Sequence, residues 1–173
     1  INPGFLDMVR YAHGKGLYTA TSTNAHFLDD AKAEATVRSG LSRLIISLDG
    51  TTQETYAQYR REGELDKVIA GTRNIIAWKR RLKSRTPHVV FQFLVVKPNE
   101  HQIPEARKLA HELGVDELWL KTAQIYAPKD DHPLIPLQDK YARYRRNASG
   151  VWEVKNKLED NCWKMWHSCV ITW

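Results

Sequence analysis

The sequence predicts an α/β fold in which parallel β-strands alternate with outer helices. Three stretches run from an amphipathic segment through a glycine into a β-rich run: "YAHGKGLYTATST", "ATVRSGLSRLIISLDG" and "LAHELGVDELWLKTA". A fourth β-rich run, "HVVFQFLVV", follows a long helical pattern. Strands that alternate with helices and carry near-continuous apolar runs pair in parallel and are covered on both faces. The fold is therefore a doubly wound sheet or a (β/α) barrel.

Four strands are expected, at residues 17–22, 43–48, 89–96 and 117–122. Three of them follow a glycine, Gly16, Gly40 or Gly114, placed where a helix ends and the backbone takes positive φ.

The helices are marked by their starts and by their apolar period. Asn2 before Pro3 is expected to cap the first helix, and Thr51-x-x-Glu54 has the form of a capping box. Two later helices have a 3.6-residue apolar period, on residues Leu65, Val68, Ile69, Ile75, Ile76 and Leu82, and on residues Ile103, Ala106, Leu109, Ala110 and Leu113.

Composition indicates a globular protein with one domain or most of one. The 173 residues are 42% hydrophobic and 27% charged, with a net charge of +6 that favours an anionic partner. No apolar run approaches the roughly 20 residues that span a bilayer, so no membrane partner is expected. Two cysteines, Cys162 and Cys169, are too few for a disulfide framework, which predicts a reducing cytoplasm.

Polar residues recur where the expected strands end. Ser47 and Asp49 follow the second strand, and Thr23-Asn24, Lys97–Asn99 and Lys121-Thr122 follow the others. Ligands of parallel α/β folds bind at the carboxyl ends of the strands. We therefore expect Thr23, Ser47 and Asp49 to converge on a common cavity there.

Several motifs together resemble one enzyme family. They are Asn2-Pro3-Gly4-Phe5 at a helix start, Ser22-Thr23-Asn24-Ala25 and Ser47-Leu48-Asp49-Gly50 after strands, and Cys162-Trp163-Lys164-Met165-Trp166 near the end. In order and spacing the chain resembles radical S-adenosylmethionine enzymes with a C-terminal SPASM extension. One departure is TNA, because the family usually has TNG at this point.

The resemblance implies a domain layout. Residues 1–127 would form a partial radical S-adenosylmethionine (β/α) barrel, with about four of its six strands. Residues 128–160 would be a helical linker, and residues 161–173 the start of a truncated SPASM-type domain. The family's CxxxCxxC loop and GGEP-like motif would lie upstream of Ile1, so the chain is expected to be an excised piece of a longer protein.

The resemblance also implies cofactors and site residues. The cofactors would be S-adenosylmethionine and a 4Fe-4S cluster whose ligands lie upstream, with an auxiliary iron–sulfur cluster in the SPASM region. Ser47, Asp49, Thr23 and Asn24 would line the S-adenosylmethionine site, and Asn99 would lie near the adenine. In the intact protein, Cys162 would be a metal ligand and Cys169 a small buried residue.

The implied reaction is reductive cleavage of S-adenosylmethionine to a 5′-deoxyadenosyl radical, which abstracts a hydrogen atom from a small-molecule or peptide substrate. The catalytic residues are unknown. This chain alone would be inactive, because it lacks the three cysteines of the cluster motif. The isolated piece is also expected to self-associate through the exposed edge of residues 17–22.

Three alternatives have weaker support. A basic α/β module that binds nucleic acid or another anion without redox chemistry would explain "WKRRLKSR" and "KYARYRR", but no nucleic-acid motif accompanies them. A phosphate-binding barrel enzyme needs a glycine-rich loop that "KTAQIYAPKDD" does not supply. A zinc site in "CWKMWHSC" lacks a fourth ligand at motif spacing.

Overall fold

Four strands form one parallel sheet in a computed structural model that describes residues 2–156 and 164–171. The strands are β1 (Ala20–Thr23), β2 (Arg43–Ser47), β3 (His88–Val95) and β4 (Glu117–Thr122), side by side in chain order. Every neighbouring pair is parallel. A doubly wound sheet reverses its strand order at a switch point, whereas a barrel winds in one direction. The unreversed order is that of part of a (β/α) barrel.

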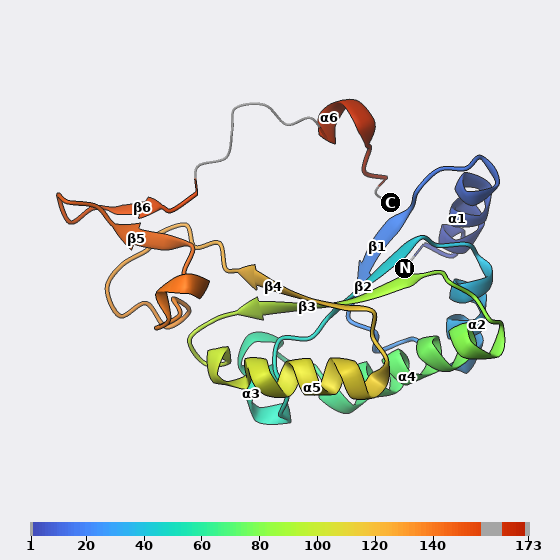
Figure 1. Cartoon of the computed structure of the whole chain (residues 1–173), viewed down its shortest axis with the longest axis horizontal. Coiled ribbons are helices and arrows are strands. Elements are labelled where there is room, and N and C mark those ends of the chain that lie inside the picture. The colour runs from blue at the N-terminus through green and yellow to red at the C-terminus, as the bar shows by residue number, and fades with distance from the viewer. Residues whose placement is uncertain (1, 157–163, 172–173) are drawn as a thin grey trace.

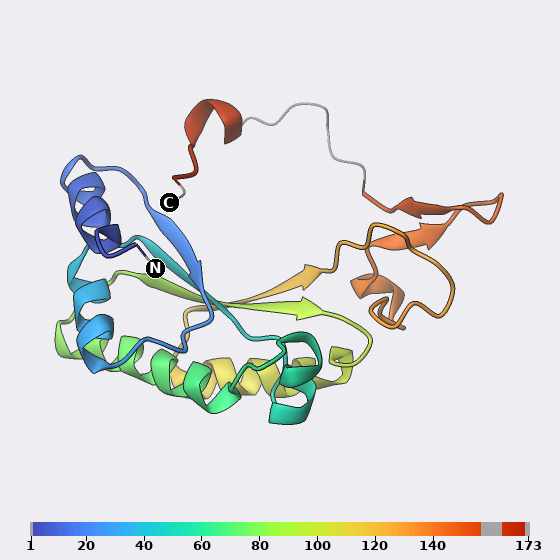
Figure 2. The same cartoon turned by 180° about the vertical axis from the view of Figure 1, so that it is seen from behind.

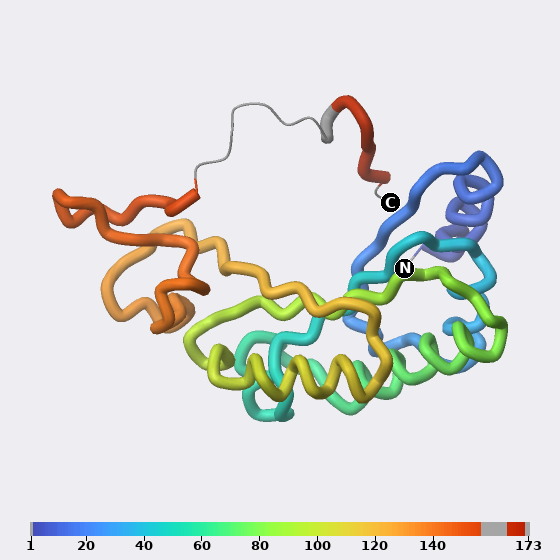
Figure 3. Tube along the Cα trace, in the orientation of Figure 1, coloured from blue at the N-terminus to red at the C-terminus, as the bar shows by residue number. Residues whose placement is uncertain are grey.

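The helices that connect the strands lie on one side of the sheet (Figures 1 and 2). Between strands the chain forms α2 (Asp30–Arg38), α3 (Gln53–Tyr59), α4 (Leu65–Arg81), η1 (Glu100–Gln102) and α5 (Ile103–Leu113). The trace in Figure 3 shows α4 and α5 running beneath the strands. In the described part of the chain no helix packs on the opposite side. The expectation that both faces are covered is therefore wrong for these residues, because helices of a barrel cover its outside only.

Strand register assigns side chains to the two faces. Leu44 and Ile46 pair with Val89 and Phe91, and all four are buried against the helices. The alternate residues Arg43, Ile45 and Ser47 pair with His88, Val90 and Gln92 on the other side. We call the two sides the helix face and the open face.

The turns between helices and strands form as predicted. Gly16, Gly40 and Gly114 have φ values of 71°, 77° and 80°, which confirms the expected left-handed conformation. The four strands also lie where the sequence predicts, within three residues at each end.

Two helix starts differ from expectation. α1 (Phe5–Gly14) begins after Gly4, although the Asn2 side chain does accept a hydrogen bond from the Gly4 amide at 2.8 Å. α3 is capped by Thr52, whose hydroxyl accepts from the Thr55 amide. Thr51 lies one residue before this cap, and its amide donates to the Gln102 side chain at 2.8 Å.

The segment after β4 contains a hairpin instead of the expected helical linker. After the short η2 (Asp139–Tyr141), strands β5 (Tyr144–Arg146) and β6 (Trp152–Val154) pair antiparallel. Asn147 and Gly150 make the turn, with φ of 75° at Gly150. Asn and Gly favour such turns, and this local signal outweighs helix formation.

Residues 166–171, near the end of the chain, are exposed. The short α6 (Lys164–His167) is followed by residues 168–171, which are all exposed. Within residues 2–156 and 164–171, no helix combines the length and apolar character that crossing a bilayer requires.

Candidate functional site

Ser47 ends β2 on the open face, at the carboxyl edge of the sheet. The residue is 8% exposed, and its hydroxyl makes no hydrogen bond within the described part of the chain. Gln92 and Trp119 lie beside it in register on β3 and β4. The Gln92 amide likewise makes no hydrogen bond to the described residues, so the edge presents two polar groups that can bind a ligand.

Asp49 extends the pairing of β2 and β3 beyond the end of β2. Its Oδ1 accepts from the Leu94 amide at 3.0 Å, and its Oδ2 accepts from Arg60 Nε at 2.5 Å. The Asp49 carboxylate is 2% exposed while the Arg60 side chain is 37% exposed. Asp49 therefore joins the end of β2 to β3 through the Leu94 amide. Its buried charge is neutralised by the partly exposed guanidinium of Arg60 through a charged hydrogen bond.

Asn99 closes the same edge from the loop after β3. Its side-chain nitrogen donates to the carbonyl groups of Asp49 and Leu94, at 3.0 and 2.8 Å, and its oxygen accepts from the Val96 amide at 2.8 Å. Asn99 is 1% exposed. Its polar atoms are used within the protein, which makes it a support for the Asp49 turn.

The loop after β1 carries Thr23, Asn24 and Ala25. Thr23 pairs with Ile46, so its side chain is on the helix face, and its hydroxyl accepts from the Ala25 amide at 3.0 Å. Asn24 is exposed at the end of the strand. Ala25 has φ of 60°, the left-handed conformation that glycine adopts most easily. The backbone thus keeps the shape of the TNG motif although alanine has replaced glycine.

The expected convergence of Thr23, Ser47 and Asp49 is corrected by these contacts. All three do lie at the carboxyl edge of the sheet. However, Thr23 is on the opposite face from Ser47, and both oxygens of Asp49 are already hydrogen-bonded. Ser47 and Asn24 are the expected residues that keep a free polar group, since only the oxygen of the Asn24 amide is engaged, by the His26 amide.

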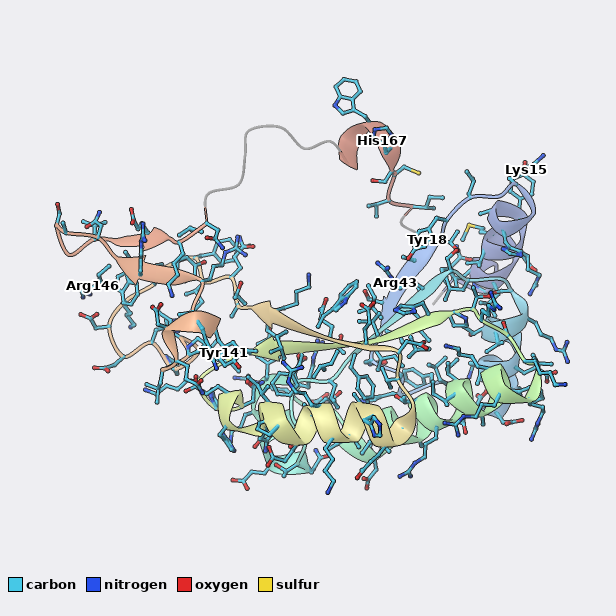
Figure 4. The ribbon with its side chains drawn as sticks, in the orientation of Figure 1. Lys15, Tyr18, Arg43, Tyr141, Arg146 and His167 are labelled. Carbon is cyan, nitrogen blue, oxygen red and sulfur yellow. The ribbon has the colours of Figure 1, made fainter. Side chains whose placement is uncertain are left out.

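A row of stacked cations and aromatic rings covers another part of the open face. Arg43 Cζ lies 5.5 Å from the centre of the Tyr18 ring and 5.0 Å from that of Trp119, and Lys121 Nζ lies 5.2 Å from Trp119. Figure 4 shows Tyr18 and Arg43 on the side of the sheet away from α4 and α5. Sequence reasoning missed this row. The alternation Arg43, Ile45, Ser47 could have placed Arg43 on the same face as Ser47.

Tyr56 and His26 lie beneath the same edge. Tyr56 is fully buried, and its hydroxyl lies 3.5 Å from His26 Nε2. Burial raises the pKa of the Tyr56 hydroxyl, and the nearby Arg60 charge offsets part of that effect. Tyr56 is therefore a neutral group that packs α3 under the loop of Asn24.

The predicted metal ligand Cys162 lies outside the described residues. Cys169 is exposed with a free thiol in this chain, and its expected burial in the intact protein stays a prediction. Among the described residues, no three histidine, cysteine, aspartate or glutamate side chains are grouped to hold a metal ion.

Comparison with curated proteins identifies enzymes as relatives. The chain is 32% identical over 124 residues to GTP 3′,8-cyclase of Hydrogenovibrio crunogenus, covering 71% of this chain and 35% of the relative. It is 30% identical over 139 residues to PqqA peptide cyclase of Gluconobacter oxydans, covering 79% and 37% of the two proteins. The chain thus spans about a third of the length of these relatives. No protein-family model matches it.

Solved structures share the fold. Streptococcus suis SuiB bound to S-adenosylmethionine superposes with a TM-score of 0.58 at 13% identity, over 78% of this chain and 29% of SuiB. The enzyme anSMEcpe with bound AdoMet and the Kp18Cys peptide gives a TM-score of 0.56 at 16% identity, over 78% and 37%. The relatives and the structural neighbours are radical S-adenosylmethionine enzymes. The unreversed parallel sheet, its one-sided helices and these superpositions agree, and the chain has the fold of part of a radical S-adenosylmethionine α/β barrel.

Proposed function

We propose that this chain is part of a radical S-adenosylmethionine enzyme. When bound, S-adenosylmethionine supplies a 5′-deoxyadenosyl radical on reductive cleavage, and this radical abstracts a hydrogen atom from the substrate. The fold shared with structures that hold S-adenosylmethionine supports the proposal. The observation that carries it is Ser47, a nearly buried residue at the carboxyl edge of the open face whose hydroxyl makes no hydrogen bond in the described chain.

The polar groups at this edge fit the cofactor. S-adenosylmethionine presents ribose hydroxyls, a carboxylate and an ammonium group, which all require hydrogen-bond partners when they leave water. The hydroxyl of Ser47 and the amides of Asn24 and Gln92 can donate and accept such bonds. We propose that these three residues contact the cofactor, while Asp49 and Asn99 position the edge and Thr23 shapes the preceding loop.

The 4Fe-4S cluster would be held by residues outside these 173. The sequence has two cysteines, whereas a CxxxCxxC loop supplies three. We therefore propose that the isolated chain neither binds this cluster nor cleaves S-adenosylmethionine. Cys162 would serve as a ligand of an auxiliary cluster in a SPASM-type domain that begins near residue 161.

The proposed substrate is a peptide or a small molecule. SuiB was solved with its precursor peptide SuiA and anSMEcpe with the Kp18Cys peptide. Relatives also include GTP 3′,8-cyclase. An open face bordered by Trp119, Arg43 and Lys121 suits a substrate with anionic or aromatic groups.

Formation of 5′-deoxyadenosine tests the proposal. The full-length protein that contains this chain would be reconstituted with iron and sulfide under anaerobic conditions, then incubated with S-adenosylmethionine and dithionite. Chromatography should detect 5′-deoxyadenosine, which should be absent with the 173-residue chain alone. A reconstituted full-length protein that forms none would refute radical chemistry and favour the basic binding module. Turnover by the isolated chain would refute its proposed inactivity.

A further inference from the structure

A positively charged cavity lies beyond the carboxyl end of β4, between that end, η2 and the residues that flank the β5–β6 hairpin. It measures about 350 Å³ and is lined by Thr122, Asp139, Lys140, Ala142, Arg143, Lys155 and Asn156. In Figure 1 the hairpin follows the arrowhead of β4, so the cavity is formed where the barrel meets the segment that follows it. Three of the seven side chains are cationic and one is anionic.

Arg143 is the cation of this cavity without a partner. The residue is half-buried, and its Nε is inaccessible to solvent and makes no hydrogen bond. Within the described part of the chain its guanidinium has no ion pair either. Its two terminal nitrogens are not among the buried atoms and make no hydrogen bond to a described residue, so they are the donors that can reach a bound anion.

The two lysines leave further positive charge at the cavity. Lys140 Nζ lies 4.7 Å from the centre of the Tyr141 ring and forms no ion pair with a described residue. Lys155 donates to both the carbonyl and the carboxylate of Asp139. Because the ammonium group has three protons, Lys155 keeps one donor beyond these two bonds.

We propose that this cavity binds an anionic group, a carboxylate or a phosphate, with Arg143 as its main ligand and Lys140 as a second cation. Guanidinium groups bind both anions through paired hydrogen bonds. The hydroxyl of Thr122 and the amide of Asn156 add neutral donors. The site goes beyond the proposed function, since it requires neither S-adenosylmethionine nor an iron–sulfur cluster.

The test is calorimetric titration of the 173-residue chain with inorganic phosphate and, separately, with succinate, at constant ionic strength in chloride. At least one anion should bind saturably. Arg143→Gln should weaken that binding roughly tenfold or more, as expected for loss of a charged hydrogen bond. Tighter binding of phosphate would assign a phosphate ligand, and tighter binding of succinate a carboxylate.

Arg145→Gln is the matched control. Arg145 lies two residues farther along the chain, in β5, but its Nε pairs with Glu153 at 2.9 Å and the residue does not line the cavity. Circular dichroism would show whether each variant is folded. If Arg143→Gln does not fold, Lys140→Gln serves as the test variant, because Lys140 is exposed, and it should also weaken binding. The proposal is overturned if neither anion saturates, if the folded variants bind like the wild type, or if Arg145→Gln weakens binding equally.

Discussion

Gly71, in the middle of α4, lies directly against the carbonyl group of Ala25 in the loop after β1. A Cβ atom on Gly71 would come within 2.3 Å of the Ala25 oxygen. The absence of a side chain thus lets the helix approach the backbone that presents Asn24 at the carboxyl edge. The Asn74 amide adds a hydrogen bond to the carbonyl of Leu28, at 2.8 Å, in the same loop.

Gly71→Ala should destabilise the protein by about 1–3 kcal/mol, the usual range for overpacking. In an open helix the same change would be stabilising by about 1 kcal/mol, because alanine favours helix. Urea denaturation measures the difference. Gly14→Ala is the control, since nothing lies within 4 Å of its Cβ position. Equal effects of the two substitutions would contradict the contact with Ala25.

Glu100 anchors the segment after β4 to the start of α5. The residue is 7% exposed, and its carboxylate accepts hydrogen bonds from the amides of Leu137 and Gln138, both at 3.1 Å. Glu100→Ala should raise amide exchange at Leu137 and Gln138 by roughly tenfold or more. Hydrogen-exchange mass spectrometry measures this. Glu105→Ala, at an exposed position of α5, should leave exchange unchanged, and protection that persists in Glu100→Ala would refute the anchor.

Asp116 couples α4 to the sheet in a way that depends on pH. It accepts from Lys79 Nζ at 2.6 Å and from the Val89 amide at 2.7 Å. Burial alone would raise the pKa of Asp116, but these two hydrogen bonds outweigh it and lower the pKa from 3.8. The stabilisation is therefore present above about pH 4 and is lost as the pH falls through the lower pKa of the folded state.

Asp116→Asn should cost about 1 kcal/mol at pH 7, a value reduced by the partial exposure of the pair. The difference from the wild type should shrink as the pH falls below about 4. Denaturation at several pH values measures both effects. Asp131→Asn is an exposed control without an ion pair to described residues. A difference that stays constant down to acid pH would show that the charge of Asp116 does not contribute.

β1 is an edge strand in the described sheet, because it pairs with β2 alone. Leu17 and Tyr18, just before it, are 60% and 63% exposed. An unpaired edge with apolar neighbours favours association with a second chain. Sedimentation of the isolated chain should show a dimer or larger species that Ser22→Lys reduces. A monomer at high concentration in the wild type would contradict the prediction.

The fold could be predicted because local signals and sheet topology agree. Gly16, Gly40 and Gly114 have positive φ and follow helices at the places where the amphipathic patterns end. The runs of β2, β3 and β4 are apolar enough to be recognised as strands from the sequence. The bounds predicted for β1, residues 17–22, differ from the observed Ala20–Thr23 by up to three residues. It has neighbours on one side only, so its extent depends on pairing with β2 more than on its own apolar pattern.

The facing of the site residues could not be predicted from local sequence. Ser22, Thr23 and Asn24 are all polar, so no alternation shows which of them faces the helices. The register with Ile45 and Ile46 decides it. Asp49 bonds to Leu94, which is 45 residues away in sequence, and Asn99 bonds to Asp49, which is 50 residues away. Their other partners lie closer in the sequence. Such long-range hydrogen bonds distinguish a supporting residue from one that contacts a ligand.

Affinity for S-adenosylmethionine in the reconstituted full-length protein with Ser47→Ala tests the central claim most directly. The affinity should fall roughly three- to tenfold, as for a lost hydrogen bond. The unfolding midpoint should not change, because the Ser47 hydroxyl makes no hydrogen bond to the described protein. Thr21→Val, on the helix face of β1, should leave the affinity unaltered. Wild-type affinity in Ser47→Ala would contradict the assignment of this edge as the cofactor site.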